Sequence, residues 1–185
     1  MNKLLCALLM ALPVTAVAGG SSTPIADNKL VEVDTQIVEH QHAVNQEEIA
    51  MGKLAQANSS SAGVKKYGAT LVKDHTAADK SLTVFAKAKG IPAIPADASQ
   101  PDAEKKDKAD MTAKLKALKG SEFDRMFVEM MASGHDKEVT RVTADITQAT
   151  DKNLVTLLTK TKPVLQAHAE TAHGLDKNNT PSAGK

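Results

Sequence analysis

The chain has 185 residues, with 23 basic and 22 acidic side chains and a single cysteine, Cys6. This balance provides no basic surface of the kind that binds nucleic acid through phosphate neutralisation, so we expect no nucleic-acid partner. The length suits one domain with its own core, and because the chain has no Trp, one Tyr and three Phe, that core must be aliphatic, as in helical bundles.

Residues 1–18 have the three parts of a secretory signal peptide. Lys3 precedes an apolar run from Leu4 to Leu12, and Ala16-Val17-Ala18 is the small-x-small pattern that a signal peptidase cuts. The run is far shorter than the roughly 20 residues of a membrane-spanning helix, and no later segment approaches that length. We therefore expect an exported, periplasmic protein without a membrane span, and without a cysteine once the signal is removed.

Apolar residues recur at three- and four-residue steps through most of the chain after residue 28, which predicts α-helices rather than strands. Serine runs, Gly with Pro, or an Asp at a helix start mark where one helix ends and the next begins. Four long helices are predicted, with a proline-rich connection and a shorter, charged helix between the two pairs. The segments are 29–58, 64–90, 102–118, one that begins at Ser121, and one from Asp151 to Leu175.

This order describes an all-α, ferritin-like four-helix bundle with one long crossover that contains the shorter helix. In such a bundle, the helix that ends at Gly90 and the helix that begins at Ser121 run parallel. The bundle domain is expected over residues 28–176. Residues 177–185, which are polar with Gly and Pro, are expected to form a disordered tail.

Each long helix carries one ionisable residue three or four positions from an apolar residue of its inner face: Glu48, His75, His135 and His168. At a rise of about 1.5 Å per residue, the four groups reach similar heights in the bundle. Three imidazoles and a carboxylate at one level match ligand sets of zinc, copper or iron. We therefore predict a transition-metal site made of these four residues. The neighbours that could orient the imidazoles are Asp74, Asp79, Glu138 and Glu170.

A metal-free explanation of the same residues is open at this stage. Three His and a Glu could form a polar network that only fixes the helix register. The protein would then be a non-catalytic structural or interaction module. His40 and His42 are less specific, and His173, which follows Glu170 in an E-x-x-H pair, is expected at the surface.

Sequence motifs favour a binding protein over an enzyme. A di-iron centre would need about four inward carboxylates, and Glu48 is the one carboxylate among the predicted inward-facing residues. The chain has no nucleophile elbow, glycine-rich phosphate loop or H-E-x-x-H motif. An oxidase or peroxidase would need a redox metal and an access channel, which the sequence does not reveal.

Each of the four predicted metal ligands lies in a stretch typical of one protein family. The stretches are Glu48 to Ala55, Val64 to His75, Phe123 to His135 and Pro163 to His168. Together they resemble the exported bacterial family of domain of unknown function 4142, over residues 30 to 175. Members of that family are often labelled predicted outer-membrane proteins and are placed near the ferritin-like fold. The resemblance implies the fold and the export, and no activity.

The family pattern has Asp-His in both parallel helices. This chain has Asp74-His75 in the first helix but Gly134-His135 in the second. A mechanism that needs two matched Asp-His pairs is therefore disfavoured. The leading hypothesis is a periplasmic bundle that binds a metal or another ligand in its His/Glu layer, in envelope stress or metal homeostasis.

Overall fold

The computed structural model of the protein describes residues 29–96 and 101–179. This part of the chain contains no strand, so the predicted all-α class is confirmed. The predicted signal peptide, residues 1–18, and residues 180–185 of the predicted tail lie outside the described residues. The helices are α1 (Glu32–Asn58), α2 (Ala62–Ala88), α3 (Asp102–Ala117), α4 (Gly120–Gln148) and α5 (Lys152–Asn179).

The five predicted helices are all present, with ends that differ from the predicted ones by a few residues. The second helix ends before Gly90, which has a positive φ of 81° that favours glycine. Asp151 accepts hydrogen bonds from the backbone N–H groups of Asn153 and Leu154, and so caps α5 as expected. The last helix continues past Asp176 into the first residues of the predicted tail.

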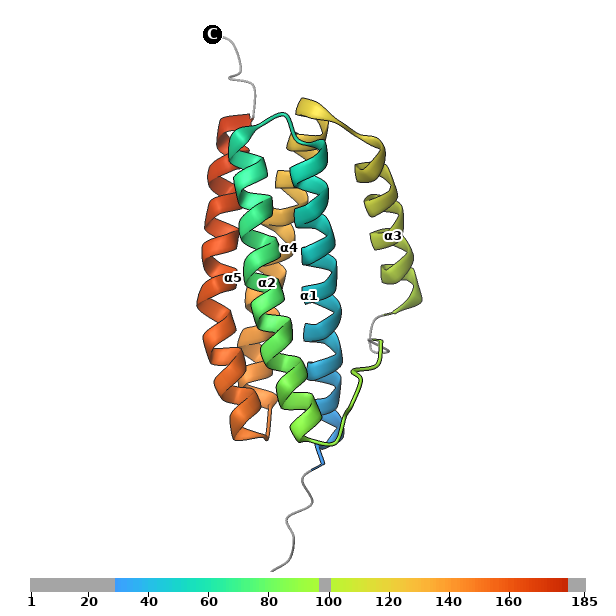
Figure 1. The fold of residues 1–185 in the computed structure, drawn as a ribbon, viewed down its shortest axis with the longest axis vertical. Helices are drawn as coiled ribbons and strands as arrows, with labels where there is room; N and C mark the ends of the chain where they lie inside the picture. The colour runs from blue at the N-terminus through green and yellow to red at the C-terminus, as the bar shows by residue number, and fades with distance from the viewer. Residues whose placement is uncertain (1–28, 97–100, 180–185) are drawn as a thin grey trace, which may run out of the picture.

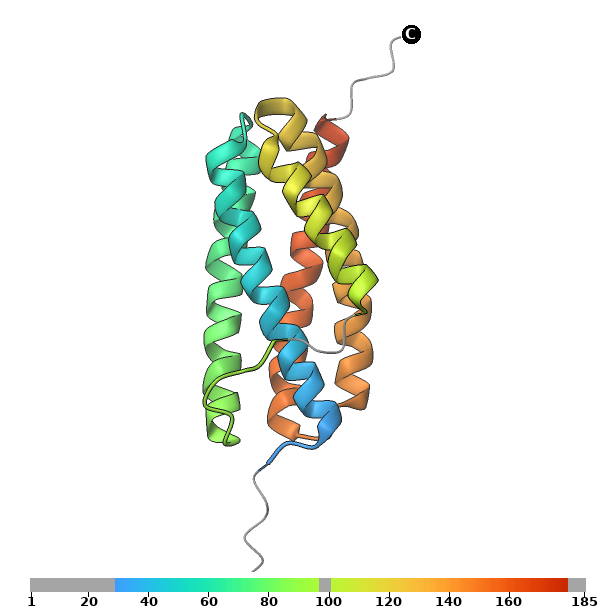
Figure 2. The ribbon, with the colours of Figure 1, turned by 90° about the vertical axis from the view of Figure 1, so that its right-hand side faces the viewer.

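The long helices form two antiparallel hairpins, α1 with α2 and α4 with α5, packed side by side (Figure 1). α2 and α4 run in the same direction, as predicted. α3 returns the chain along the outside of the bundle, over α1 and α4 (Figure 2). Most of α3 is exposed, and Leu115 is its one fully buried residue among those described. In the described ranges, no helix combines the length and apolar character that a membrane crossing requires.

A pair of glycines lets α1 and α2 pack closely. A Cβ atom added to Gly52 would lie 2.5 Å from the backbone oxygen of Gly68, and one added to Gly68 would lie 2.7 Å from the Cβ of Ala55. Both distances are too short for real contacts. The first hairpin therefore depends on the absence of side chains at this crossing, next to Tyr67 and Leu71.

Two buried aspartates tie each hairpin to the turn of the other one. Asp34, near the start of α1, accepts hydrogen bonds from the Thr150 N–H at 2.8 Å, the Thr150 hydroxyl at 2.6 Å and the Asp151 N–H at 3.1 Å. Asp124, near the start of α4, accepts hydrogen bonds from the backbone N–H of Ser60, the backbone N–H of Ser61 and the Ser60 hydroxyl. Each turn thus has its backbone donors satisfied by the opposite hairpin.

The interior consists of two apolar clusters with a polar layer between them. One cluster contains the two stacked rings of Phe123 and Phe127, and the other contains Leu154 and Leu158. Three helices each pass from one cluster to the other through a histidine. These runs are Leu71, His75 and Leu82 on α2; Met131, His135 and Val142 on α4; and Leu165, His168 and Ala172 on α5.

Candidate metal centre

Three of the four predicted ligands meet in this polar layer. His75, His135 and His168 each offer one ring nitrogen, and these nitrogens lie within 4.8 Å of one another. The ring centroids are 6.0 Å apart for His75 and His135, and 5.3 Å and 5.2 Å for the two pairs that include His168. The three residues are 3 %, 1 % and 3 % exposed. Three helices thus place three imidazoles together, away from solvent.

In each ring, one nitrogen is held by an oxygen atom. His75 Nδ1 lies 2.9 Å from the Oδ1 of Asn45, and His135 Nδ1 lies 2.9 Å from the carbonyl oxygen of Met131. His168 Nε2 lies 3.1 Å from a carboxylate oxygen of Asp74. Because each of these oxygens accepts, each of these ring nitrogens is an N–H donor.

The other nitrogen of each ring therefore carries a lone pair. These atoms, His75 Nε2, His135 Nε2 and His168 Nδ1, are buried and have no hydrogen-bond partner. A ring whose N–H is fixed by an oxygen and whose second nitrogen is free has the form in which histidine binds a metal ion. The cluster offers three acceptors and no donor, so the three rings cannot satisfy one another.

Burial keeps the imidazoles neutral. Burial, and after it the imidazoles of His168 and His135, lowers the pKa of His75 from 6.5 to about 3. Burial lowers the pKa of His135 to about 4, although the hydrogen bond to the Met131 carbonyl acts in the opposite direction. Burial also lowers the pKa of His168, against the effect of Asp74. All three rings are thus in the metal-binding form at neutral pH.

Glu48, the fourth predicted ligand, does not belong to this group of donors. It lies on α1 and lines a separate cavity of about 490 Å³ between α1, α3 and α4, together with Lys108 and Glu138. Burial, and then the carboxylates of Glu47 and Glu138, raises the pKa of Glu48 to about 8. Its side chain is therefore a neutral carboxylic acid at pH 7.

Tyr67 lies beside the histidines. Its ring centroid is 6.3 Å from that of His168 and 6.5 Å from that of His135, and its hydroxyl donates to the backbone oxygen of His168 at 3.2 Å. Burial, followed by the charge of Glu48, raises the pKa of Tyr67. A neutral tyrosine is thus in contact with two of the three imidazoles.

The predicted orienting residues are only partly correct. Asp74 holds His168 as expected, but Asp79 pairs with His42 at 2.6 Å and Glu138 pairs with His40 at 3.2 Å, rather than with a histidine of the cluster. His173 is at the surface, where it pairs with Asp136. Asn45 and the Met131 carbonyl were not foreseen. The sequence feature that could have identified Asn45 as a histidine partner is its position on the inner face of α1, three residues before Glu48.

Residues 19–175 match a family described as "Domain of unknown function (DUF4142)". The chain belongs to this family. No curated protein and no solved structure compared with the chain matches it. The resemblance of the sequence to this family is therefore confirmed.

Proposed function

We propose that this DUF4142 protein is an exported, ferritin-like bundle that binds a divalent transition metal ion through His75, His135 and His168. The observation that carries the proposal is the set of three buried, unpartnered ring nitrogens in one layer, each with its opposite ring nitrogen fixed by an oxygen. A cation is the partner that satisfies three converging lone pairs at once.

The donor set limits the choice of metal. Neutral imidazoles suit zinc, copper and iron, and the described residues offer no thiolate. Three histidines with one further position open is also the arrangement in which zinc activates water, but the near-complete burial of the three rings favours storage, transfer or sensing over turnover. A role in metal homeostasis or stress protection of the cell envelope fits this arrangement.

The proposal that the protein is exported is based on the sequence of residues 1–18. The family match begins at residue 19, directly after the proposed cleavage site, which supports a leader outside the domain. The ferritin-like assignment rests on two antiparallel hairpins joined by a crossover that spans the bundle length, with α2 parallel to α4 (Figure 1).

The alternative is a structural module in which the same layer is a metal-free polar network. The three unpartnered acceptors argue against it, because a network that stabilises a fold satisfies its members. Replacing all three histidines by leucine distinguishes the metal site from the metal-free network. A purely structural layer gains stability or keeps it when matched apolar residues replace the buried polar ones.

The test is isothermal titration of tag-free, chelator-treated protein with Zn²⁺, Cu²⁺ and Fe²⁺, combined with elemental analysis after dialysis. We expect one ion per chain, a rise in melting temperature with that ion, and loss of both effects in His135→Ala. His173→Ala is the matched control, because His173 is exposed and pairs with Asp136. Absence of a stoichiometric ion together with an unchanged melting temperature would refute the proposal.

A further inference from the structure

A cleft of about 320 Å³ opens beside the histidine cluster, between α1, α2 and α5. This volume lies at the lower end of the range for small-molecule sites, which is about 300–1,000 Å³. Its walls are mainly apolar and come from two helices: Ala78 and Leu82 on α2, and Leu157, Leu158, Val164 and Leu165 on α5. Val164, at 38 % exposure, is one of the few exposed large apolar residues of the described chain.

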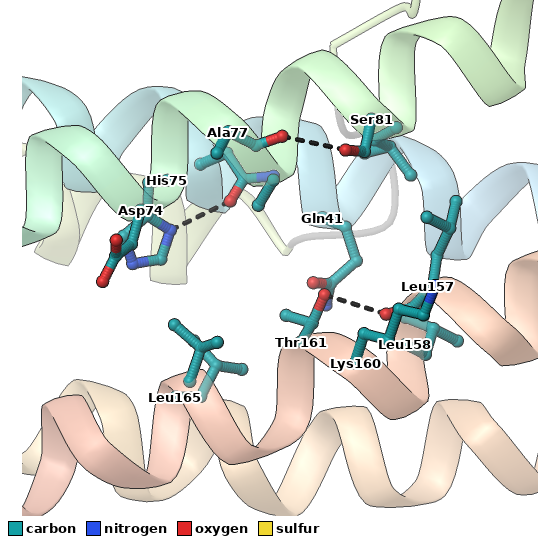
Figure 3. Close-up of a pocket in the computed structure, with 14 residues that line it drawn as sticks. Gln41, Asp74, His75, Ala77, Ser81, Leu157, Leu158, Lys160, Thr161 and Leu165 are labelled. Atoms are coloured by element: carbon teal, nitrogen blue, oxygen red, sulfur yellow. Dashed lines mark hydrogen bonds between the residues drawn. The ribbon is translucent and has the colours of Figure 1, made fainter.

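Gln41 places a free hydrogen-bond donor at this cleft. Its side chain reaches from α1 toward Thr161 of α5 (Figure 3), and the residue is 5 % exposed. Its amide nitrogen Nε2 is buried without a partner. A buried, unpaired amide destabilises the folded protein by roughly 1–3 kcal/mol. A ligand that supplies an acceptor for this donor would remove that cost. Because the terminal amide torsion is soft, a rotation can turn this nitrogen toward the cleft that Gln41 lines.

Four other polar groups of the cleft are already engaged, and Lys160, which also lines it, is exposed. The hydroxyls of Ser81 and Thr161 donate to backbone oxygens of their own helices, as the dashed lines of Figure 3 show. Asn45 is bonded to His75, and Asp74 to His168. The carboxylate of Asp74 and the apolar walls both disfavour an anion deep in the cleft. The missing group is therefore an uncharged oxygen acceptor.

We infer that this cleft binds a small uncharged organic molecule with an apolar body and one carbonyl or ether oxygen, which accepts a hydrogen bond from Gln41. The body packs against the aliphatic walls of α2 and α5. Both partners of the Asn45–His75 hydrogen bond line the cleft, so its occupant lies directly beside the histidine cluster. This inference is independent of whether the cluster holds a metal ion.

The probes are camphor, which has a carbonyl on a compact hydrocarbon cage, and bornane, which has the same cage without the oxygen. Binding to chelator-treated protein is followed by ¹H–¹⁵N NMR, with the side-chain amide of Gln41 as the reporter. We expect camphor to bind about tenfold more tightly than bornane, as one neutral hydrogen bond allows, and only camphor to shift the Gln41 amide signals. Use of metal-free protein keeps this result separate from the metal proposal.

Two variants and one control sharpen the test. Gln41→Leu should bind both probes with equal affinity, and Ala78→Phe, which fills the cleft, should bind neither. Gln56→Leu, the same substitution at an exposed site of α1, should keep the preference for camphor. Equal affinity of camphor and bornane for the wild type, no saturable binding of camphor, or shifts confined to other surfaces would each overturn the inference.

Discussion

Metal binding by the three-histidine cluster should be nearly independent of pH between 7.0 and 5.5. An ordinary imidazole, with a pKa of 6.5, is about nine-tenths protonated at pH 5.5 and loses about tenfold in metal affinity. Three ordinary imidazoles would together lose several hundredfold over this range. The perturbation to apply is therefore a simple change of pH, because metal and proton compete for the same lone pairs.

The buried histidines should lose much less metal affinity than ordinary imidazoles. With pKa values of about 3 and about 4, His75 and His135 are still neutral at pH 5.5, so neither contributes a measurable loss. The pKa of His168 is also lowered, so its loss is smaller than that of an ordinary imidazole. Glu48, with a pKa of about 8, keeps its proton through the whole range. The total loss of affinity should be less than about tenfold.

The assay is isothermal titration with Zn²⁺ at pH 7.0, 6.2 and 5.5, repeated in buffers of different ionisation enthalpy to count released protons. We expect less than one proton per ion at pH 6.2. The His173→Ala background removes an exposed histidine that lies outside the cluster. A loss of several hundredfold in affinity, or release of two to three protons per ion, would show that the imidazoles are ordinary and that the argument from burial is wrong.

Further predictions concern single residues. Asp74→Asn should weaken metal affinity by roughly 10–100-fold in the same titration, because the carboxylate no longer orients its histidine; unchanged affinity would contradict this. Gly52→Ala should lower the free energy of unfolding in urea, although alanine is the better helix former by about 1 kcal/mol, because its Cβ would meet Gly68; a more stable variant would contradict the close packing. Asp34→Ala should cost about 2–4 kcal/mol in the same measurement, since it leaves buried backbone donors of a turn unpaired; a cost below about 0.5 kcal/mol would show that water replaces the carboxylate. For Glu48 the folded pKa lies above the unfolded one, so its stabilising contribution is present below pH 4.5 and is lost as pH rises to about 8. Glu48→Gln should therefore lose less stability than the wild type between pH 5 and pH 8, and parallel profiles would refute the raised pKa.

The helices and the histidine layer could be predicted because both depend on helical geometry alone. A period of 3.6 residues decides which positions face inward, and the rise per residue decides their height. His75, His135 and His168 each interrupt an apolar run, so spacing was sufficient to bring them together. Family membership was predictable for the same reason, since its matching stretches contain these positions.

The place of Glu48 could not be predicted in this way. α1 packs against α2 on one side and against α4 on the other, and an inward position on such a helix can face either neighbour. Asn45 and Glu48 are three residues apart, which separates them by roughly 60° around the helix. This angle turns Asn45 toward His75 and Glu48 toward the cavity beside α3. The partners of each imidazole depend on side-chain direction, which spacing does not specify.

The crossed aspartate ties recur at a fixed interval along the chain. Asp34 and Asp124 are separated by the same interval as the Ser60 and Thr150 turns that they bind, and the segment Glu32-Val33-Asp34 has its counterpart in Glu122-Phe123-Asp124. In one hairpin the aspartate and the turn lie at opposite ends of a 27-residue helix, about 40 Å apart, so no hairpin can bind its own turn. Two antiparallel hairpins placed side by side can bind each other's turns, so the two ties hold the hairpins together at both ends of the bundle.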